Sequence, residues 1–391
     1  MRPYVLLECQ RGDTHKAYVN QKRELTTSLK CNCLFRVRSY LLSCGEWSVS
    51  VIDGRHNHTM ATRFEGHKYV ERLKAEEAIL VCELTKNNTL PRNILLMIRT
   101  KNANSSTTIK HIYNVQQRMI KEVRGIRSEM QQILKCLSGK NYTYSTKLFS
   151  DNKTISDVFF THPDSIKLVN LFPIVIVMDS TYNTNKYGIP LLEFVGSTST
   201  GLTFSSGFAY MTAEKEENFV WALERYRDLL KCHEYPKVIV NDRYVALMNV
   251  EKFFQKATAL LCRYHTSANV KSNMKVICHF KKDAEDKEKA TQMYIDIMAA
   301  WESILESVTK EEYADSIVSF RQLCAEFPIF VDYVESTILG LVKEKVVSAW
   351  TNRVIHLGNT TTNRVESTHA RLKLYIQNCM GDICKNWESI S

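Results

Sequence analysis

Two aspartates follow apolar, β-branched runs that are typical of buried strands. Asp179 ends the stretch IVIVMD, residues 174 to 179, and Asp242 follows VIVN, residues 238 to 241. Ligands bind at the carboxyl edge of a parallel sheet, so two neighbouring strands would bring these carboxylates together there. A hard cation relieves their repulsion, and the pattern therefore predicts a Mg²⁺ or Mn²⁺ site that takes a third carboxylate from elsewhere. A turn or helix cap is the alternative for either aspartate alone.

Strand-like and helical runs alternate around these aspartates from about residue 166. The apolar patterns predict strands, an amphipathic helix and a further strand in the order β-β-β-α-β. These segments are SIKLVNLFPIVIVMD, GIPLLEFVGSTST, LTFSSGFAYM, EENFVWALERYRDLL and PKVIVND. The short strand ATALLCRYH follows, then a charged helical stretch from about 280 to 350 and a helix containing TTNRVESTHARLKLYIQ. The order favours an α/β domain with a helical insertion.

The first 60 residues are predicted to form a small β-rich module from the strand-like runs YVLLEC, CLFRVRSYLL and EWSVSVIDG. The candidate zinc ligands, spaced C-x23-C-x22-H-x-H, are Cys9, Cys33, His56 and His58. Sulfur and imidazole ligands suit tetrahedral Zn²⁺, and so small a core needs such a cross-link. Cys31 and Cys44 are alternative ligands, and Trp47 is predicted to lie in the core.

Between about residues 66 and 145 the apolar period changes to that of helices. The helical segments predicted there are YVERLKAEEAILVCELTK, LPRNILLMIRT and TTIKHIYNVQQRMIKEVRGIRSEMQQILKCL. Pro91 lies near the start of the second segment, where proline is favoured. Residues 71 to 120 leave two alternatives open, a helix-turn-helix that reads DNA or helices that only pack together.

Composition and charge favour a globular protein with a polyanionic partner over a secreted or membrane protein. With 391 residues, 44% of them hydrophobic, the chain has room for two or three globular domains. Lys and Arg number 52 against 42 Asp and Glu, and the net charge of +10 favours a polyanionic partner such as nucleic acid. We expect neither a signal peptide nor a membrane span, because no uncharged run reaches about 18 residues. The 12 irregularly spaced Cys predict reduced thiols, with a minority as metal ligands, in an intracellular protein.

Three blocks of the sequence together resemble the Mutator-like element (MULE) transposases, a family related to the far-red-impaired-response transcription factors of plants. The blocks are MDSTYNTNKYGIPLLEFVGSTSTGLTFSSGFAYMTAEKEENFVWAL, VIVNDRYVALMNVEKFFQKATALLCRYHTSANV and TTNRVESTHARLKLY. The resemblance implies a ribonuclease-H-like fold with a helical insertion and a catalytic triad of Asp179, Asp242 and Glu366. It also implies phosphoryl transfer assisted by two Mg²⁺ or Mn²⁺ ions, with cleavage at the ends of a DNA element and transfer of 3′-hydroxyl strands to target DNA.

The same resemblance extends to residues near the acids. Cys262 and His265 match a Cys-x-x-His element of the family, for which we expect a structural or DNA-positioning role rather than metal binding. Arg364, His369 and Arg371 lie near Glu366 on the last predicted helix. For these three residues, contact with DNA phosphates and an ordinary solvated helix position are both open.

The N-terminal stretch resembles the zinc finger found at the front of these transposases, which is similar to the WRKY and glial-cells-missing type. The family's second Cys falls on Cys33, and Leu34 replaces the usual proline. The basic residues predicted to face the DNA backbone are Lys22, Lys30, Arg36 and Arg38.

We therefore predict an α/β protein with four segments. They are a zinc-finger module at 1–62, a helical bridge at 66–150, a ribonuclease-H-like domain at 166–280 and 350–391, and a helical insertion at 281–349. The expected partner is double-stranded DNA, including terminal inverted repeats, bound by a homo-oligomer in the nucleus. The rival interpretations are a domesticated DNA-binding transcription regulator, an inactive transposase relic, and a ribonuclease H acting on RNA–DNA hybrids. The chain starts so close to Cys9 that we expect an upstream strand to be missing, and it stops at Ser391 soon after Glu366, where we expect relatives to continue.

Overall fold

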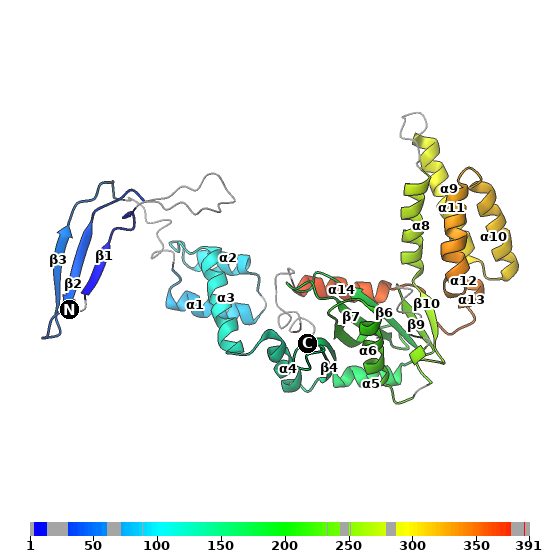
Figure 1. The fold of residues 1–391 in the computed structure, drawn as a ribbon, viewed down its shortest axis with the longest axis horizontal. Helices are drawn as coiled ribbons and strands as arrows, with labels where there is room; N and C mark the ends of the chain where they lie inside the picture. Colours follow the sequence, from blue (N-terminus) through cyan, green and yellow to red (C-terminus); the bar gives the residue numbers. More distant parts are fainter. Residues whose placement is uncertain are drawn as a thin grey trace. The chain divides into compact units, whose positions relative to one another are not determined.

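The computed structural model divides into two compact units, Met1–Ile120 and Lys121–Ser391 (Figure 1). The residues that it describes are 4–13, 30–60, 72–87, 89–232, 234–242, 250, 252–278, 287–376 and 387. Lys22, one of the predicted DNA-contacting residues, lies outside these ranges. Among the described residues, no helix combines the length and the apolar character that crossing a membrane requires.

The first unit begins with a three-stranded antiparallel sheet in the order β1–β2–β3. Its strands are β1 (Tyr4–Glu8), β2 (Arg36–Leu41) and β3 (Trp47–Asp53). Nearly every side chain of β1 and β3 is exposed, including Trp47 at 56%. The prediction that Trp47 lies in a core is therefore wrong, because both outer strands of this thin sheet are open to solvent. Apolar burial alone cannot hold such a module together.

Three helices follow: α1 (Ala75–Lys86), α2 (Pro91–Lys101) and α3 (Ile109–Arg124), whose last turn crosses the boundary of the first unit at Ile120. They share a small core whose buried members are Val81, Ile94, Ile98, Ile112 and Val115. Pro91 is the first residue of α2, as the sequence predicted. The packing of these helices fits both a helix-turn-helix and helices that only pack together. A role in DNA recognition for residues 71 to 120 therefore stays a prediction.

The second unit is built on a seven-stranded mixed sheet in the order β10–β9–β6–β7–β8–β5–β4. Its strands are β4 (Thr143–Leu148), β5 (Ile155–Thr161), β6 (Val175–Thr181), β7 (Leu191–Ser197), β8 (Thr203–Tyr210), β9 (Val238–Asn241) and β10 (Thr258–Leu261). Strands β6, β9 and β10 are parallel, and the remaining pairs are antiparallel. The predicted order β-β-β-α-β is confirmed as β6, β7, β8, α6 (Glu216–Arg227) and β9.

Helix caps and helix breakers make two elements of the structure differ from the prediction. The long helical segment predicted from 107 to 137 breaks at Gly125, whose φ is +61°, and α4 (Glu129–Gly139) starts anew because Ser128 and Gln131 form a capping box. The residues SIKLVNLF belong largely to a helix, α5 (Pro163–Leu171), and not to a strand; His162 caps its start, where Pro163 is the first residue. Both α4 and β4 fall within the range 66–150 expected to form the helical bridge, yet belong to the second unit.

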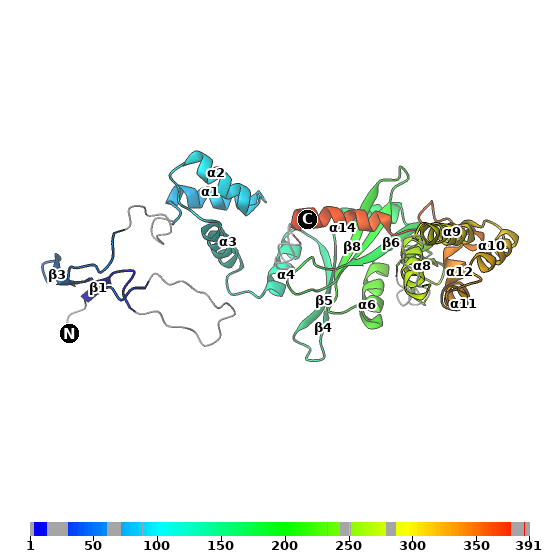
Figure 2. The same cartoon turned by 90° about the horizontal axis from the view of Figure 1, so that it is seen from above.

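Helices cover both faces of the large sheet (Figures 1 and 2). On one face α5 and α6 pack over a core that includes Ile176 and Met178 of β6. On the opposite face α14 (Asn363–Ile376) packs over β6 and β7, and its Val365 lies with Val175 and Val177. Because side chains alternate along a strand, Asp179 shares the face of Val177 and therefore points to the side that α14 covers.

The remaining helices form a group of their own that joins the sheet at β10 (Figure 1). It contains α8 (Arg263–Ile277), α9 (Lys287–Glu306), α10 (Lys310–Leu323), α11 (Pro328–Asp332), the π-helical segment η1 (Tyr333–Leu339), α12 (Gly340–Val346) and α13 (Ser348–Thr351). Trp301, Phe320 and Phe330 are fully buried in its core, together with Val270 and Met274 of α8. The helical group therefore begins earlier in the chain than the predicted insertion at 281–349.

Candidate functional site

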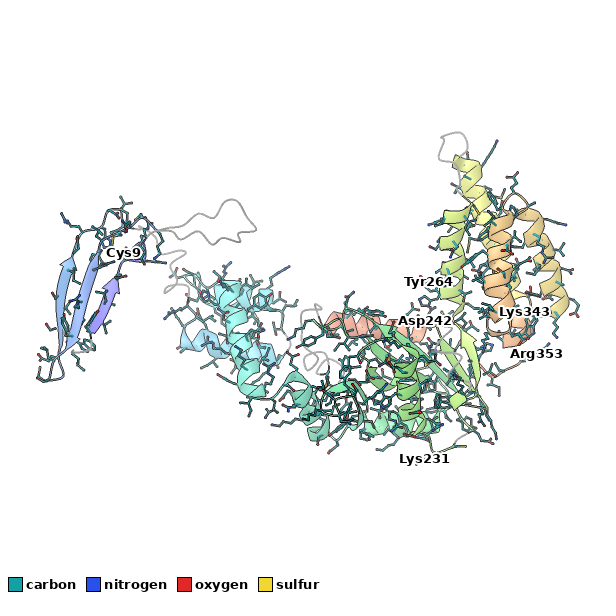
Figure 3. All side chains as sticks on the ribbon, in the orientation of Figure 1. Cys9, Lys231, Asp242, Tyr264, Lys343 and Arg353 are labelled. Carbon is teal, nitrogen blue, oxygen red and sulfur yellow. The ribbon has the colours of Figure 1, made fainter. Side chains whose placement is uncertain are left out.

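The two aspartates occupy one register position at the carboxyl edge of β6 and β9. Val177 pairs with Val240, and Asp179 and Asp242 each follow two residues later, because 242 − 179 and 240 − 177 both equal 63. The sequence predicts Asp179 at the end of its strand. In the structure Asp179 lies inside β6, because antiparallel pairing with β7 extends the strand to Thr181. Figure 3 shows Asp242 at the end of the sheet from which α8 rises.

Burial and a neighbouring negative charge raise the pKa of Asp179 to about 7. The residue is only 7% exposed, so loss of hydration disfavours its ionised form, and the charge of Asp242 adds to the effect. His369, the backbone N–H of Ser180 and His265 oppose the shift without cancelling it. The two carboxylates therefore lie close enough to repel each other, and their oxygens are the donor type that a hard divalent cation prefers.

Glu366 reaches this edge from the first turn of α14. Its Oε1 accepts a 2.6 Å hydrogen bond from Thr362 Oγ1 and lies 3.9 Å from His265 Nδ1. The pKa of His265 is raised to about 9, first by its hydrogen bond with Cys262 and then by the charges of Cys262, Asp242 and Glu366. The three acids named from the sequence thus act electrostatically on one imidazole, since His265 also lowers the pKa of Asp179.

Cys262 is fully buried one residue after β10, at the same edge of the sheet. The backbone N–H and the hydroxyl of Thr362 both lie 3.2 Å from its Sγ. Burial by itself raises the pKa of this thiol, but the hydrogen bonds from His265 and Thr362 outweigh burial and lower it. One ligand atom each from Cys262, His265 and Glu366 lie within 4.8 Å of one another. The sequence predicted no metal role for the Cys-x-x-His element, because Glu366 becomes its neighbour only through the fold.

Arg263 fixes the segments on which these residues sit. Its Nε donates to Val346 O at 2.7 Å, and its Nη2 donates to Ser348 Oγ at 2.9 Å and Thr351 Oγ1 at 3.1 Å. Its backbone N–H donates to Thr360 O at 3.0 Å. One residue thereby ties the start of α8 to the end of the helical group and to the segment that leads into α14.

Glu193 and His369 form a second buried contact with Asp179 that sequence reasoning did not identify. His369 Nδ1 lies 3.7 Å from Asp179 Oδ2, and its Nε2 lies 3.3 Å from Glu193 Oε2, although the angle there does not make a hydrogen bond. Glu193 is 1% exposed, pairs with Asp179 across β6 and β7, and accepts from Ser205 Oγ at 2.6 Å and Thr368 Oγ1 at 2.9 Å. The sequence feature that could have pointed to Glu193 is its position as a single carboxylate inside the apolar run GIPLLEFVG.

Replacing Glu193 by alanine is expected to lower the free energy of unfolding by about 2 kcal/mol, because the hydroxyls of the partly buried Ser205 and the buried Thr368 lose their acceptor. Glu193→Gln retains an amide oxygen and should cost less. Glu311→Ala, on the exposed first turn of α10, serves as the control and is expected to change stability by less than about 0.5 kcal/mol. Urea denaturation followed by circular dichroism measures all three, and equal stability of Glu193→Ala and Glu311→Ala would contradict the structural role of Glu193.

The basic residues predicted to contact DNA are in several cases bonded within the protein. Arg364 Nε donates to Asn359 Oδ1 at 2.6 Å, and its Nη1 donates to Gly201 O at 2.8 Å and Thr203 Oγ1 at 3.0 Å. This guanidinium ties the start of α14 to the β7–β8 turn. Arg371, by contrast, lies exposed on α14.

Within the N-terminal module each described basic candidate has an acidic or aromatic neighbour. Lys30 Nζ lies 3.6 Å from Asp13 Oδ2, and Arg36 Nε lies 3.0 Å from Glu8 Oε1. Arg38 donates to Tyr40 Oη at 3.2 Å and stacks over the ring of Tyr4. These contacts involve exposed or partly exposed side chains, so they leave the charges available at the surface.

The four N-terminal candidate ligands come together in the fold. Cys9 Sγ lies 3.2 Å from His58 Nε2, Cys33 Sγ lies 3.4 Å from His56 Nδ1, and the four ligand atoms are within 4.8 Å of one another. The alternatives Cys31 and Cys44 are exposed, and neither is a member of this group in the described residues. Two sulfurs and two imidazole nitrogens in one place fit Zn²⁺.

The electrostatics of Cys33 favour the deprotonated form that a metal ligand needs. Burial opposes its ionisation, but the backbone N–H groups of Phe35 and Asn57, together with the side chains of His56 and Cys9, lower its pKa to about 6. The turn that carries the first ligand is held by Gly12, whose backbone N–H donates to Cys9 O at 2.8 Å. The module therefore presents a set of ligands ready for a metal.

Comparisons with known proteins identify the region that holds the aspartates. Residues 175–269 match the MULE transposase domain family, a range that includes Asp179, Asp242, Cys262 and His265 but not Glu366. Protein FAR1-RELATED SEQUENCE 5 of Arabidopsis thaliana is 21% identical over 310 residues, which cover 76% of this chain and 39% of that protein. Protein FAR1-RELATED SEQUENCE 6 of the same plant is 22% identical over 236 residues, 58% of this chain and 32% of that protein.

A further curated protein matches almost the whole of this chain. The PKS-NRPS hybrid synthetase cheA of Chaetomium globosum is 22% identical over 395 residues, which cover 95% of this chain but 8% of that protein. This chain therefore spans less than two fifths of the length of each of these curated relatives.

Proposed function

We propose that this chain, which carries a MULE transposase domain and is related to the FAR1-related sequence proteins, is a metal-dependent DNA transposase. In this proposal it cleaves DNA at the ends of an element and transfers the 3′-hydroxyl strands to target DNA. The observation that carries the proposal is the common register position of Asp179 and Asp242 at the carboxyl edge of β6 and β9. Glu366 joins them from α14, which packs on β6.

The acids fit a hard divalent cation by their chemistry and by their charge. Asp179 is buried beside Asp242, and its raised pKa reflects a repulsion that a dication relieves. Asp179, Asp242 and Glu366 would hold Mg²⁺ or Mn²⁺, which when bound supplies Lewis-acid activation of the attacking hydroxyl and stabilisation of the leaving 3′-oxygen.

The surrounding residues keep these acids in place for that chemistry. Thr362 orients Glu366 through its 2.6 Å hydrogen bond, and His265 provides a positive charge beside the acids. Asp179 Oδ1 accepts from the backbone N–H of Ser180, while His369 Nδ1 lies 3.7 Å from the other oxygen, Oδ2, and its Nε2 lies beside Glu193. In this proposal Asp179 and Glu366 are already oriented by these neighbours before a cation binds.

The proposed DNA contacts are electrostatic and come from both units. Lys22, Lys30, Arg36 and Arg38 of the zinc module would face the phosphates of double-stranded DNA, and Arg371 would do so beside the acids. Arg364 is left out of this face, because its guanidinium is already bonded to protein oxygens. Action on two element ends implies a homo-oligomer on DNA, and the nucleus is the corresponding location.

A domesticated DNA-binding regulator is the second candidate, favoured by the relation to the FAR1-related sequence proteins. Cleavage of DNA distinguishes the two. The purified chain is incubated with Mg²⁺ or Mn²⁺ and with duplexes taken from the genomic sequence that flanks its gene. A transposase is expected to cut these duplexes in a metal-dependent manner. Metal-independent binding without cutting would contradict the transposase and favour the regulator, while cutting confined to RNA–DNA hybrids would favour a ribonuclease H.

A further inference from the structure

The side chains of Cys262, His265 and Glu366 form a compact group beside the two aspartates. One ligand atom of each lies within 4.8 Å of the other two, and His265 Nδ1 is 3.9 Å from Glu366 Oε1. Cys262 is fully buried, whereas His265 and Glu366 each keep about a third of their side chains exposed. A thiol, an imidazole and a carboxylate therefore converge on one point that remains accessible from solvent.

Secondary structure holds the three residues in this arrangement. Cys262 directly follows β10, His265 is in the first turn of α8, and Glu366 is in the first turn of α14. Arg263 links the same segments through its bonds to Val346, Ser348, Thr351 and Thr360. The group is thus pre-organised by a strand end and two helix starts, and it does not depend on a long loop.

The hydroxyl of Thr362 approaches all three members of the group. Its Oγ1 lies 2.6 Å from Glu366 Oε1, 3.2 Å from Cys262 Sγ and 3.3 Å from His265 Nδ1. A hydroxyl carries a single hydrogen, so it serves only one of these acceptors at a time. The three atoms therefore gather around one hydroxyl group, and an ion bound to them would take over its hydrogen-bonding role.

We propose that Cys262, His265 and Glu366 bind a thiophilic divalent ion of the Zn²⁺ class, at a site distinct from the all-oxygen set of Asp179 and Asp242. Three ligands from Cys, His and a carboxylate, with a fourth position left to water, match the ligand types and open coordination of zinc sites. Bond lengths near 2.0 to 2.3 Å place the ligand atoms of a tetrahedral ion about 3.5 Å apart. Because the ligand atoms lie within 4.8 Å of one another, their separations need to close by at most about 1.3 Å to reach that spacing.

The choice of ion follows from the ligand types. Sulfur and imidazole nitrogen favour Zn²⁺, Co²⁺ or Cd²⁺ over Mg²⁺, which prefers oxygen ligands throughout. Glu366 is the only member that also belongs to the proposed magnesium centre. If that proposed function holds, an ion bound here withdraws one carboxylate from the catalytic set.

Metal content tests the proposal without reference to catalysis. The full chain is prepared metal-free under reducing conditions, reconstituted with Co²⁺ or Zn²⁺ and freed of excess ion. Wild type is expected to hold about two ions per chain, one of them in the N-terminal Cys/His group, and Cys262→Ser about one. The thiolate-to-cobalt charge-transfer absorption should decrease in Cys262→Ser, because one sulfur ligand is lost.

The controls separate loss of a ligand from loss of the fold. Cys232→Ser removes an exposed thiol outside both groups and should keep the wild-type ion content. His265→Gln changes a partly exposed residue and should lose one ion even if Cys262→Ser proves unstable. Circular dichroism establishes that each variant is folded. Equal ion content in wild type and in a folded Cys262→Ser or His265→Gln variant would overturn the proposal, whether or not the protein cuts DNA.

Discussion

Replacing Asp179 by asparagine is expected to abolish metal-dependent cleavage and to stabilise the metal-free protein at the same time. Loss of a charged ligand should lower the cleavage rate about a thousand-fold, equivalent to roughly 4 kcal/mol of transition-state stabilisation. The amide is uncharged, so it removes the repulsion from Asp242 and the cost of burying a carboxylate. A gel assay on flanking-sequence duplexes measures the first effect, and thermal denaturation measures the second.

The gain in stability has a defined pH dependence. The pKa of Asp179 is about 7 in the folded protein against 3.8 ordinarily, so the folded state binds the proton more tightly than the unfolded chain. Stability of the metal-free wild type should therefore fall as the pH rises from about 4 to about 7, and Asp179→Asn should lack this contribution. At about pH 8 the variant should be more stable by about 2 kcal/mol.

Two outcomes would contradict these expectations. Equal cleavage by wild type and Asp179→Asn, or none by either, would remove the catalytic claim for this chain. A variant that is less stable than wild type at high pH would show that Asp242 and burial do not strain Asp179. Asp228→Asn, at the exposed C-terminal end of α6, is the matched control and should change neither cleavage nor the pH profile of stability.

Replacing Cys33 by serine is expected to unfold the three-stranded sheet of the N-terminal module and to abolish the DNA binding proposed for it. The described strands of this module bury few apolar side chains, so bonds to a bound Zn²⁺ would supply most of its folding free energy. Zinc binding to such small modules is worth roughly 10 kcal/mol, which the loss of one of four ligands largely removes. A strong chelator should have the same effect on wild type.

Limited proteolysis and zinc content measure this prediction. Cuts should appear within the described residues 4–13 and 30–60 of Cys33→Ser, while the second unit stays resistant. Cys44→Ser removes an exposed thiol of the same module and should retain zinc, protection and DNA affinity. Protection of the module in chelator-treated wild type would contradict a zinc-dependent fold.

The succession of strands and helices around Asp179 and Asp242 was predictable, because apolar periodicity is a local property. The order of β6, β7, β8, α6 and β9 and the helical stretch after β10 follow directly from it. The predictions were wrong where a short local motif, such as a capping box or a proline, competed with that periodicity. The capping box at Ser128 divided one predicted helix, and Pro163 turned an apolar run into α5. Strands β4 and β5 were missed, because their short runs lie between helical segments.

For the candidate site, too, some properties follow from single residues and others only from the packing of distant segments. The sequence alone determined which residues have the chemistry: Asp179 and Asp242 after apolar runs, and the C-x23-C-x22-H-x-H set, whose four atoms do converge. Only the tertiary structure decided which residues meet. Strand register sets Asp179 opposite both Asp242 and Glu193, and packing of α14 on β6 brings Glu366 to Cys262 and His265. The physical reason is that side-chain chemistry belongs to single residues, whereas proximity depends on pairings between segments that lie up to 175 positions apart.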